Sequence, residues 1–253
     1  MKKQENNRGA GRIRINRFLA MSGVSSRRKA EELVRDRKVA VNGRPVSNLA
    51  TTVDPSRDRV TVQGKPVSPA ERHVYLVLNK PRDTITTMND ERGRKTVMGL
   101  VRTRARVFPV GRLDRNTTGV LLLTNDGEFA NRLMHPRYQI PKSYKVTCDK
   151  MVTRLHLAKL RSGVSLSEKK TAPTDHVVLP GGSGKVIGIV LHEGRNRQVR
   201  RMFETLGYGV AKLDRVAYGP VTKEGIARGG TRRLTRAELR ILKEMAGIKE
   251  AWE

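Results

Sequence analysis

The stretch from Val110 to Gly127 constrains the fold of this chain more than any other. Its apolar run, Val120 to Leu123, is bounded by Gly119 and by Asn125-Asp126-Gly127, a pattern typical of a short strand buried on both faces. A polar turn that contains Asp114 leads into this run. A carboxylate at the end of a buried strand is held rigidly and can be reached by a ligand. The stretch therefore predicts a central strand and a candidate site beside it.

Asp114 lies between two arginines, Arg112 and Arg115. Positive charge nearby favours the carboxylate form, so we expect Asp114 to be ionised. The same pattern also fits a plain surface turn in which Asp114 pairs with its neighbours. This stretch alone does not decide between the two interpretations.

The charge of the chain limits its partners. Lys and Arg total 52 against 24 Asp and Glu, a formal net charge of +28. Such a field predicts a polyanionic partner, because phosphates that are neutralised release condensed counterions. Aromatic residues make up 4% of the chain, too few for an array of stacking platforms for single strands. The sequence has neither an apolar run of about 18 residues nor a basic amphipathic helix, so we expect nucleic acid and no membrane.

Length and cysteine content narrow the class further. A chain of 253 residues can form one large core or two modest ones. Its single cysteine, Cys148, excludes an intramolecular disulfide and a cysteine-based zinc site. Residues 1–12 are polar and basic and lack the apolar segment of a secretory signal, which predicts a disordered basic tail. We therefore expect a cytoplasmic protein.

Residues 13–67 form the first predicted module. A short helix that ends at Gly23 is followed by a helix that Ser25 or Ser26 caps. Two short strands then surround Asn42-Gly43, a strong hairpin signal, and residues 60–62 form a last short strand. The module carries 16 Lys and Arg against 6 acids, so it should contribute to the nucleic-acid surface.

A polar linker at residues 68–73 separates this module from a second one at 74–245, and residues 246–253 are expected to be a tail. Strands are expected at 74–78, 107–110, 120–123, 143–146 and 186–191, and helices at 127–134, 197–206 and 236–245. Strands outnumber helices without regular β-α-β alternation. The sequence therefore predicts an α+β fold with a mixed, largely antiparallel sheet.

The first module resembles the S4 RNA-binding domain. The matching segments are Arg17-Phe-Leu-Ala-Met-Ser-Gly23, Ser25-Ser-Arg-Arg-Lys-Ala-Glu-Glu-Leu33 and Val39-Ala-Val-Asn-Gly43. The resemblance implies that the second helix and the hairpin bind a structured RNA. The residues expected to contact RNA are Arg17, Arg27, Arg28, Lys29 and Asn42. The alternative is that the basic helix residues are simply a solvated face.

The second module resembles RNA pseudouridine synthases through five motifs that occur in order. They are Asn79-Lys-Pro81, Gly111-Arg-Leu-Asp-Arg-Asn-Thr-Thr-Gly119, Leu133-Met-His-Pro136, Lys142-Ser-Tyr144 and Glu193-Gly-Arg-Asn-Arg-Gln-Val-Arg-Arg-Met202. The resemblance extends over nearly all of residues 13–245. It is strongest to the ribosomal subfamily, which carries an S4 domain and acts on a single uridine of ribosomal RNA. The sequence of residues 117–127 and 131–136 is most similar to the large-subunit (23S) type.

The resemblance implies that Asp114 is the catalytic nucleophile. Pseudouridine formation breaks the glycosidic bond of uridine, turns the base and rejoins it through C5, which requires no metal, redox step or cofactor. The carboxylate can attack C1′, attack C6 or deprotonate C2′, and the sequence does not choose among these. The resemblance further implies that Arg200 pairs with Asp114. The alternative for Arg200 is a phosphate contact.

Other residues receive roles from the same resemblance. Tyr144 is expected to stack on the flipped uracil and to remove the C5 proton, although it also fits an ordinary packed strand tyrosine. Leu213 is expected on the other face of the base, and Arg112 is expected to wedge into the duplex or hold phosphate. Lys80 is expected to support the site or bind phosphate. Arg195 and Arg197 are expected to contact phosphates.

The sequence therefore predicts a monomeric rRNA pseudouridine synthase that acts on ribosomal RNA or a pre-ribosomal particle. Two alternatives remain at this point. One is a non-catalytic RNA-binding or ribosome-assembly protein on the same fold. The other is a synthase that acts on 16S ribosomal RNA or tRNA.

Overall fold

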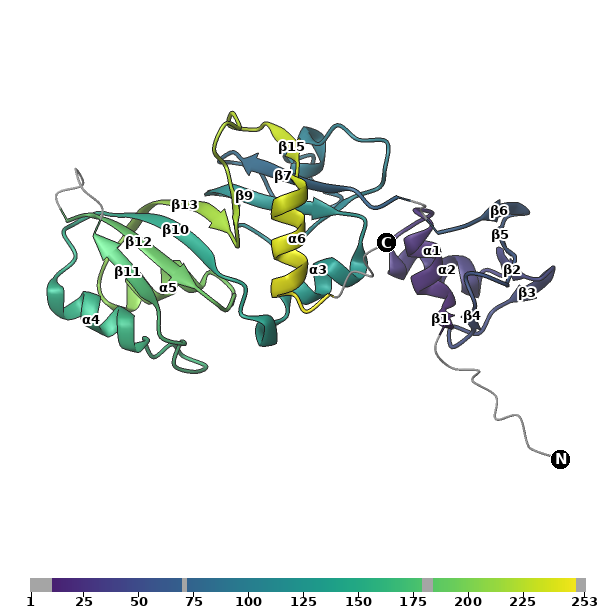
Figure 1. Cartoon of the computed structure of the whole chain (residues 1–253), viewed down its shortest axis with the longest axis horizontal. Helices are drawn as coiled ribbons and strands as arrows, with labels where there is room; N and C mark the ends of the chain where they lie inside the picture. The colour runs from purple at the N-terminus through teal and green to yellow at the C-terminus, as the bar shows by residue number, and fades with distance from the viewer. Residues whose placement is uncertain (1–10, 70–71, 179–183, 249–253) are drawn as a thin grey trace. The chain divides into compact units, whose positions relative to one another are not determined.

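The computed structural model describes residues 11–69, 72–178 and 184–248, which fall into two compact units, Met1–His73 and Val74–Glu253 (Figure 1). Most of the predicted tail at residues 1–12 lies outside the described residues. Arg12, however, is fixed: its guanidinium donates to the Thr52 carbonyl oxygen at 2.8 Å and lies 3.6 Å from Asp58. The ordered part of the first unit therefore begins before Ile13.

The first unit packs two helices against short strands around one apolar cluster that includes Ile15, Phe18 and Leu19. Its elements are β1 (Ile13–Arg14), α1 (Ile15–Met21), α2 (Arg27–Arg35), β2 (Val39–Val41), β3 (Arg44–Val46), β4 (Thr52–Val53), β5 (Val60–Val62) and β6 (Lys65–Val67). Ser26, rather than Ser25, caps α2, because its Oγ accepts the Lys29 N–H at 3.2 Å. The predicted Asn42-Gly43 hairpin is confirmed, with φ of 51° and 79° at the two turn residues. The strand β6 was not predicted.

The second unit is built on a nine-stranded sheet within the described residues. Its strands are β7 (Tyr75–Lys80), β8 (Phe108–Pro109), β9 (Thr117–Thr124), β10 (Lys142–Cys148), β11 (Asp175–Val178), β12 (Val186–Leu191), β13 (Val210–Tyr218), β14 (Val221–Thr222) and β15 (Thr231–Arg233). The main order is β11-β12-β10-β13-β9-β7-β15, and only the pair of β9 and β13 is parallel. The α+β prediction with a mixed, largely antiparallel sheet is confirmed. The sequence did not predict β13, which lies at the centre.

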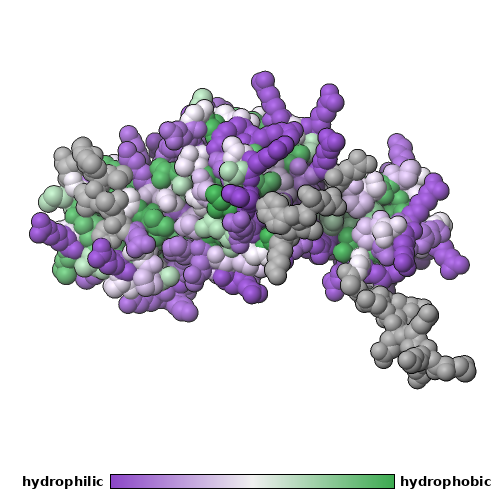
Figure 2. Space-filling view, in the orientation of Figure 1, coloured by the Kyte–Doolittle hydropathy of each residue, from purple (hydrophilic) through white to green (hydrophobic). Residues whose placement is uncertain are grey.

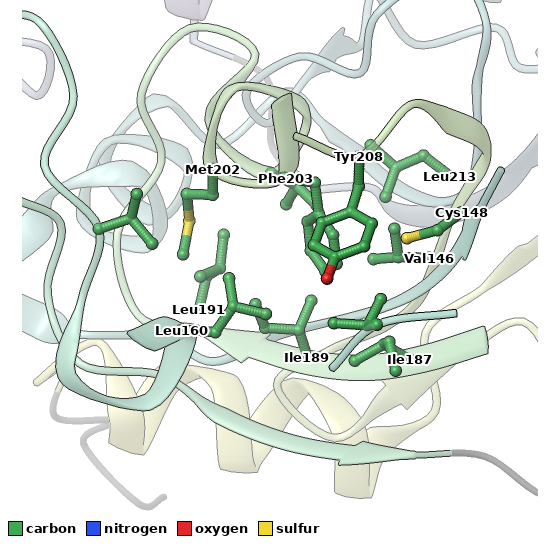
Figure 3. Packing of buried hydrophobic residues seen from close by; sticks show 13 residues of the cluster. Val146, Cys148, Leu160, Ile187, Ile189, Leu191, Met202, Phe203, Tyr208 and Leu213 are labelled. Carbon is green, nitrogen blue, oxygen red and sulfur yellow. The ribbon is translucent and has the colours of Figure 1, made fainter. Parts of the chain in front are cut away.

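Helices cover the sheet on both faces. They are η1 (Val97–Leu100), α3 (Gly127–Met134), η2 (Pro136–Tyr138), α4 (Arg154–Ser162), α5 (Gln198–Thr205) and α6 (Arg236–Met245). Along β9, Val120 and Leu122 join a cluster with α3 and α6, whereas Leu121 and Leu123 join a separate cluster with β7. Alternate residues of a strand point to opposite faces, so β9 is buried on both, as predicted. Figure 3 shows a further cluster, in which Met202 and Phe203 of α5 pack near β10 and β12.

The C-terminal boundary differs from the prediction of a tail at residues 246–253. Ala246 is fully buried and Ile248 packs against the cluster of α3 and α6. The Ala246 N–H donates to the Leu242 carbonyl oxygen, and the Thr235 hydroxyl accepts the Glu238 N–H in the predicted cap of α6. The packed chain therefore extends past Met245. Residues 249–253 lie outside the described part.

Candidate active site

The turn that carries Asp114 is fixed by the backbone around it. Asp114 is partly buried and its carbonyl oxygen accepts the Thr117 N–H at 3.0 Å, where β9 begins. The preceding residue, Leu113, is bonded twice to Thr86: its carbonyl oxygen accepts the Thr86 hydroxyl at 2.8 Å and its N–H donates to the same hydroxyl at 3.3 Å. These bonds determine where the Asp114 side chain starts.

The buried side chain of Lys80 is hydrogen-bonded to the same turn. Its side chain is fully buried, and Nζ donates to the carbonyl oxygens of Thr117 at 2.9 Å and of Pro81, Asp114 and Arg115 at 3.1 Å each. Burial lowers the pKa of Lys80 to about 8, and the negative charge of Asp114 opposes that shift. An ammonium group in this position does not reach a phosphate. Of the two predicted roles of Lys80, the geometry favours support of the site over a phosphate contact.

Two strands bring Tyr144 and Leu213 to the start of β9. In the sheet Leu213 lies opposite Val146 of β10 and, on its other side, opposite Thr117. Leu213 is buried in the cluster of Figure 3. Tyr144 is half-buried and packs both against that cluster and against the cluster that contains Leu113. Across β13, Tyr144 is in register with Gly119 through Arg215, which places it near the start of β9.

A single glycine allows β9 and β13 to approach this closely. Gly119 has φ of 103°, and a Cβ atom built on it would lie 2.1 Å from the carbonyl oxygen of Arg215. No other residue fits that space without shifting a strand. The glycine of the predicted motif thus secures the contact between β9 and β13, on which the position of Leu213 depends.

Arg200 faces the same region from α5 but does not pair directly with Asp114. Its Nη1 donates to the Val210 carbonyl oxygen at 2.9 Å. Burial lowers the pKa of Arg200, the positive charge of Arg197 adds to this, and the charge of Asp114 opposes it. The two groups therefore interact electrostatically, but among the described residues they form no ion pair within 4.0 Å. The predicted charge-assisted contact is absent from this structure.

The arginines before α5 divide into two kinds. Arg195 is used internally: it donates to the carbonyl oxygens of Lys169 at 2.9 Å and Lys170 at 3.1 Å, and it pairs with Glu193 at 3.1 Å. These bonds hold the loop that starts α5 and are at odds with the predicted phosphate contact. Arg197 is exposed, with φ of 48°, and among the described residues its side chain makes one contact, at 3.4 Å to Glu204. Its side chain is available to RNA.

Arg112 is also exposed, two residues before Asp114. Its neighbour Arg115 forms an ion pair with Asp83 instead. The turn therefore presents one arginine to solvent and binds the other to the protein. This is the arrangement that the predicted wedge or phosphate contact by Arg112 requires.

Sequence reasoning missed a partly buried polar network beside the site. The Asp214 carboxylate accepts the Thr118 hydroxyl at 2.6 Å and pairs with Lys223 and Arg228. Burial raises the pKa of Asp214, but the bonds from Lys223 and Thr118 outweigh it and leave the pKa lowered. Arg228 also donates to the Asn79 side-chain oxygen at 2.7 Å. The network ties β13 to β9, which adds to the rigidity of the sheet under the site.

In the first unit the residues that were predicted to contact RNA differ in exposure and in their bonds to the protein. Arg17, Arg27, Arg28 and Lys29 are exposed. The Asn42 side chain donates to Asp58 at 2.9 Å and accepts the Arg59 N–H at 2.8 Å. Because both ends of its amide are bonded within the protein, Asn42 shapes the turn, and the predicted RNA contact by Asn42 is not favoured. Figure 2 shows hydrophilic side chains projecting from both units.

The described residues offer neither a metal site nor a membrane span. No three His, Cys, Asp or Glu side chains are grouped as metal ligands would be. No described helix is both long and apolar enough to cross a membrane. The predicted independence of metals therefore stays a prediction.

Comparison with known proteins identifies the family. The RNA pseudouridylate synthase model matches residues 74–205 and the S4 domain model matches residues 13–58. The chain is 44% identical over 237 residues to the ribosomal large subunit pseudouridine synthase B of Bacillus subtilis, covering 92% of this chain and 96% of the relative. A protein of the same name from Pseudomonas aeruginosa is 41% identical, covering 93% of this chain and 63% of the relative. A crystal structure of a pseudouridylate synthase superposes with a TM-score of 0.67 at 28% identity, covering 91% of this chain and 99% of that one. This chain belongs to the RNA pseudouridine synthase family of isomerases, with an S4 domain at its N-terminal end.

Proposed function

We propose that this chain converts one uridine of large-subunit ribosomal RNA to pseudouridine, with Asp114 as the nucleophile. The observation that carries the proposal is the Asp114 turn, a partly buried carboxylate on a backbone held by Lys80 and Thr86. The two relatives named above are ribosomal large-subunit enzymes, which favours that RNA as the substrate. The formal charge of +28 fits a polyanionic substrate.

The reaction needs no partner reagent, because the product is an isomer of the substrate. The N1–C1′ bond of the uridine breaks, the uracil turns, and a C5–C1′ bond forms; the C5 proton leaves and N1 gains a proton. Asp114 brings about the cleavage of the N1–C1′ bond by attacking C1′, by attacking C6 or by removing the C2′ proton. A carboxylate held at a fixed position reduces the entropy lost in reaching that geometry.

Tyr144 and Arg200 have roles that follow from where they lie. Tyr144 is in register with Gly119 near the start of β9, so its ring can stack on a base held there and its hydroxyl can accept the C5 proton. Arg200 contributes positive charge to the same region without a direct ion pair in this structure. Contact with RNA can close that gap, because catalytic contacts often tighten only when substrate binds.

The target uridine must leave its helix before this chemistry can occur. Flipping a nucleotide costs on the order of a few kcal/mol, which backbone contacts have to offset. Arg112 is exposed next to the nucleophile and is suited to hold the vacated position or the adjacent phosphate. Arg197 offers a second exposed cation near α5.

The variant Asp114→Asn tests the nucleophile. The amide preserves the shape but cannot attack, whereas binding depends on many phosphate contacts, so turnover should be lost while RNA affinity stays within a few-fold. Tritium release from C5-labelled uridine RNA measures turnover, and filter binding measures affinity. Asp175→Asn, which changes an exposed aspartate on β11, is the matched control and should behave as wild type. Substantial turnover by Asp114→Asn would remove Asp114 from this role.

Mapping of pseudouridines tests the substrate. RNA from cells with and without the protein should differ at one uridine of the large-subunit RNA. A difference confined to 16S ribosomal RNA or to tRNA would replace the proposed substrate. No difference anywhere would favour a non-catalytic RNA-binding protein.

A further inference from the structure

The first unit contains a short internal repeat. The segments are Lys38-Val-Ala-Val-Asn-Gly-Arg-Pro-Val46 and Arg59-Val-Thr-Val-Gln-Gly-Lys-Pro-Val67. Five of the nine positions are identical, and three more exchange lysine for arginine or asparagine for glutamine. The S4 domain model ends at residue 58, just before the second copy. The second copy is therefore a feature of this chain beyond the part that matches that domain.

The two copies fold alike and are related by an approximate two-fold axis. Each forms a hairpin, with φ of 51° and 79° at Asn42-Gly43 and of 50° and 79° at Gln63-Gly64. The hairpins join through their inner strands in the order β3-β2-β5-β6, with Ala40 opposite Thr61 at the centre. The hydrogen bonds at the two ends of the β2–β5 pair also match. The Asn42 N–H donates to the Arg59 carbonyl oxygen, and the Gln63 N–H donates to the Lys38 carbonyl oxygen, both at 2.8 Å.

The two faces of this sheet differ. All six valines of the repeat belong to the apolar cluster beneath α1 and α2. Strand alternation therefore places the row Pro45, Ala40, Thr61 and Pro66, which are opposite one another in register, on the outer face. Figure 1 shows the two hairpins projecting from the helices of this unit. The centre of the outer face is thus made of small side chains.

Cations mark the two ends of this outer face. Lys38 and Arg59 each precede an inward-facing valine, so alternation directs both outward, and both are exposed. They lie at opposite ends of the joined strands, four residues apart in register, or roughly 13 Å along the strand direction. Arg44 and Lys65 are exposed too, but they are in register with the inward-facing Val41 and Val62 and so belong to the other face. Neither repeat contains an acid, and Lys38 Nζ pairs with Asp36 at 2.9 Å, just outside the first copy.

We propose that this outer face binds the minor-groove side of an RNA duplex, with Lys38 and Arg59 each contacting the phosphates of one strand. The inference rests on the proposed function only in that the substrate is a structured RNA. The minor groove of an A-form duplex is wide and shallow, so a face whose centre carries small side chains can approach it closely. The two strands of a duplex are antiparallel and thus related by local two-fold axes, which matches the symmetry of the repeat. The Thr61 hydroxyl, at the centre, faces the 2′-hydroxyl groups.

The edges of the sheet argue against a protein strand as the occupant. Pro45 and Pro66 lie in the two edge strands and have no N–H to offer to an added strand. The two outward-facing cations, Lys38 and Arg59, instead match the phosphate charge. The outer face also lies opposite the helices, so it contacts a different part of the RNA from Arg27, Arg28 and Lys29 of α2.

Single charge-neutralising variants of the full-length protein test the symmetry. Lys38→Gln and Arg59→Gln should each weaken binding to a 20-base-pair RNA duplex by about 3- to 10-fold at 0.15 M salt, and each should reduce the log–log salt slope by about 1. Arg57→Gln changes an exposed arginine outside the repeat and is the matched control. It should stay within about 2-fold of wild type. Thermal unfolding checks that all three variants fold.

Binding of the same variants to other nucleic acids tests whether the minor groove of duplex RNA is the site of contact. The losses should be much smaller for a DNA duplex of the same sequence, which has a narrower minor groove and no 2′-hydroxyls, and for single-stranded RNA. Equal losses on all three ligands, or wild-type binding to duplex RNA by both variants, would overturn the inference. So would variants that bind naked duplex RNA normally and lose only their association with ribosomal particles, because that result indicates a protein partner.

Single-turnover assays separate this inference from the proposed function. At saturating target RNA both variants should form pseudouridine at the wild-type rate, because they leave the second unit unchanged. If the wild-type protein forms no pseudouridine but the variants lose RNA binding as expected, the proposed function is rejected and the RNA-binding surface is still supported. An active wild type whose variants bind duplex RNA normally would reject the surface alone.

Discussion

Lys80→Met is the substitution that most directly tests how the site is held. Methionine is close to lysine in volume and fits a buried position, but it cannot donate the bonds that Lys80 makes to four carbonyl oxygens. Two of these oxygens, on Asp114 and Arg115, also accept a backbone N–H, at 3.0 and 3.4 Å. The loss therefore falls mainly on the carbonyl groups of Pro81 and Thr117.

The magnitude follows from those two groups. A buried acceptor left without a donor costs about 1–3 kcal/mol, so two cost about 2–6 kcal/mol. Removing the ammonium also removes the cost of burying a charge, which offsets part of this loss. We expect the free energy of unfolding of the second unit to fall by about 2–4 kcal/mol. Because the Asp114 backbone is released, a displacement of about 1 Å should lower the rate of chemistry on the order of 100-fold.

The assay combines urea unfolding with single-turnover pseudouridine formation at saturating RNA, and RNA affinity is measured separately. Lys95→Met is the matched control, since it removes an exposed lysine of the same unit and should change neither quantity by much. A wild-type rate and stability in Lys80→Met would refute the support of the turn by Lys80. A loss confined to RNA affinity would instead restore the phosphate contact that the sequence suggested.

Three further predictions follow from the same structure. Since burial lowers the pKa of Lys80 to about 8, the single-turnover rate should fall as the pH rises above about 8. Unfolding does not explain this loss. The pKa of Lys80 in the folded chain lies below the ordinary 10.5, so the stability contributed by this group increases as the pH rises from about 8 to 10.5. Lys142→Met should keep this pH dependence, because Lys142, whose pKa burial also lowers to about 8, is not bonded to the turn. Removal of residues 1–67 should weaken RNA binding strongly and reduce its salt slope, because 16 of the 52 basic residues leave with it, while single-turnover rates at saturating RNA survive; their collapse in a folded fragment would mean that the S4 unit shapes the site. A chelator of Mg²⁺ should not stop chemistry on prefolded RNA, and a loss that only a protein-bound metal restores would contradict this.

The sequence was sufficient where short-range chemistry decides the structure. The doubly buried strand at Val120–Leu123, the Asn42-Gly43 turn and the capped helix after Thr235 all depend on neighbours within a few residues, and all three are present. The family motifs likewise lie in contiguous segments, so the resemblance identified the enzyme class without the fold. Local pattern, net charge and motif order are properties of the chain itself.

The sequence was insufficient where a polar side chain has to choose between RNA and the protein. Lys80, Arg195 and Asn42 carry the groups that bind RNA elsewhere, and the structure bonds each of them to distant backbone or side-chain atoms instead. Those partners are 37, 26 and 16 residues away along the chain. Their proximity exists only after the chain has folded.

The central strand β13 shows the same limit. Its sequence mixes Lys212, Asp214 and Arg215 with apolar residues, so it lacks the continuous apolar run by which β9 was recognised. Asp214 is acceptable in a buried strand only because Thr118 of β9 and Lys223 from beyond β14 satisfy its carboxylate. By itself the sequence determined the family and the candidate site residues. The tertiary structure decided which of these polar groups remain free to contact a ligand, because burial and distant hydrogen-bond partners determine whether a polar group is available.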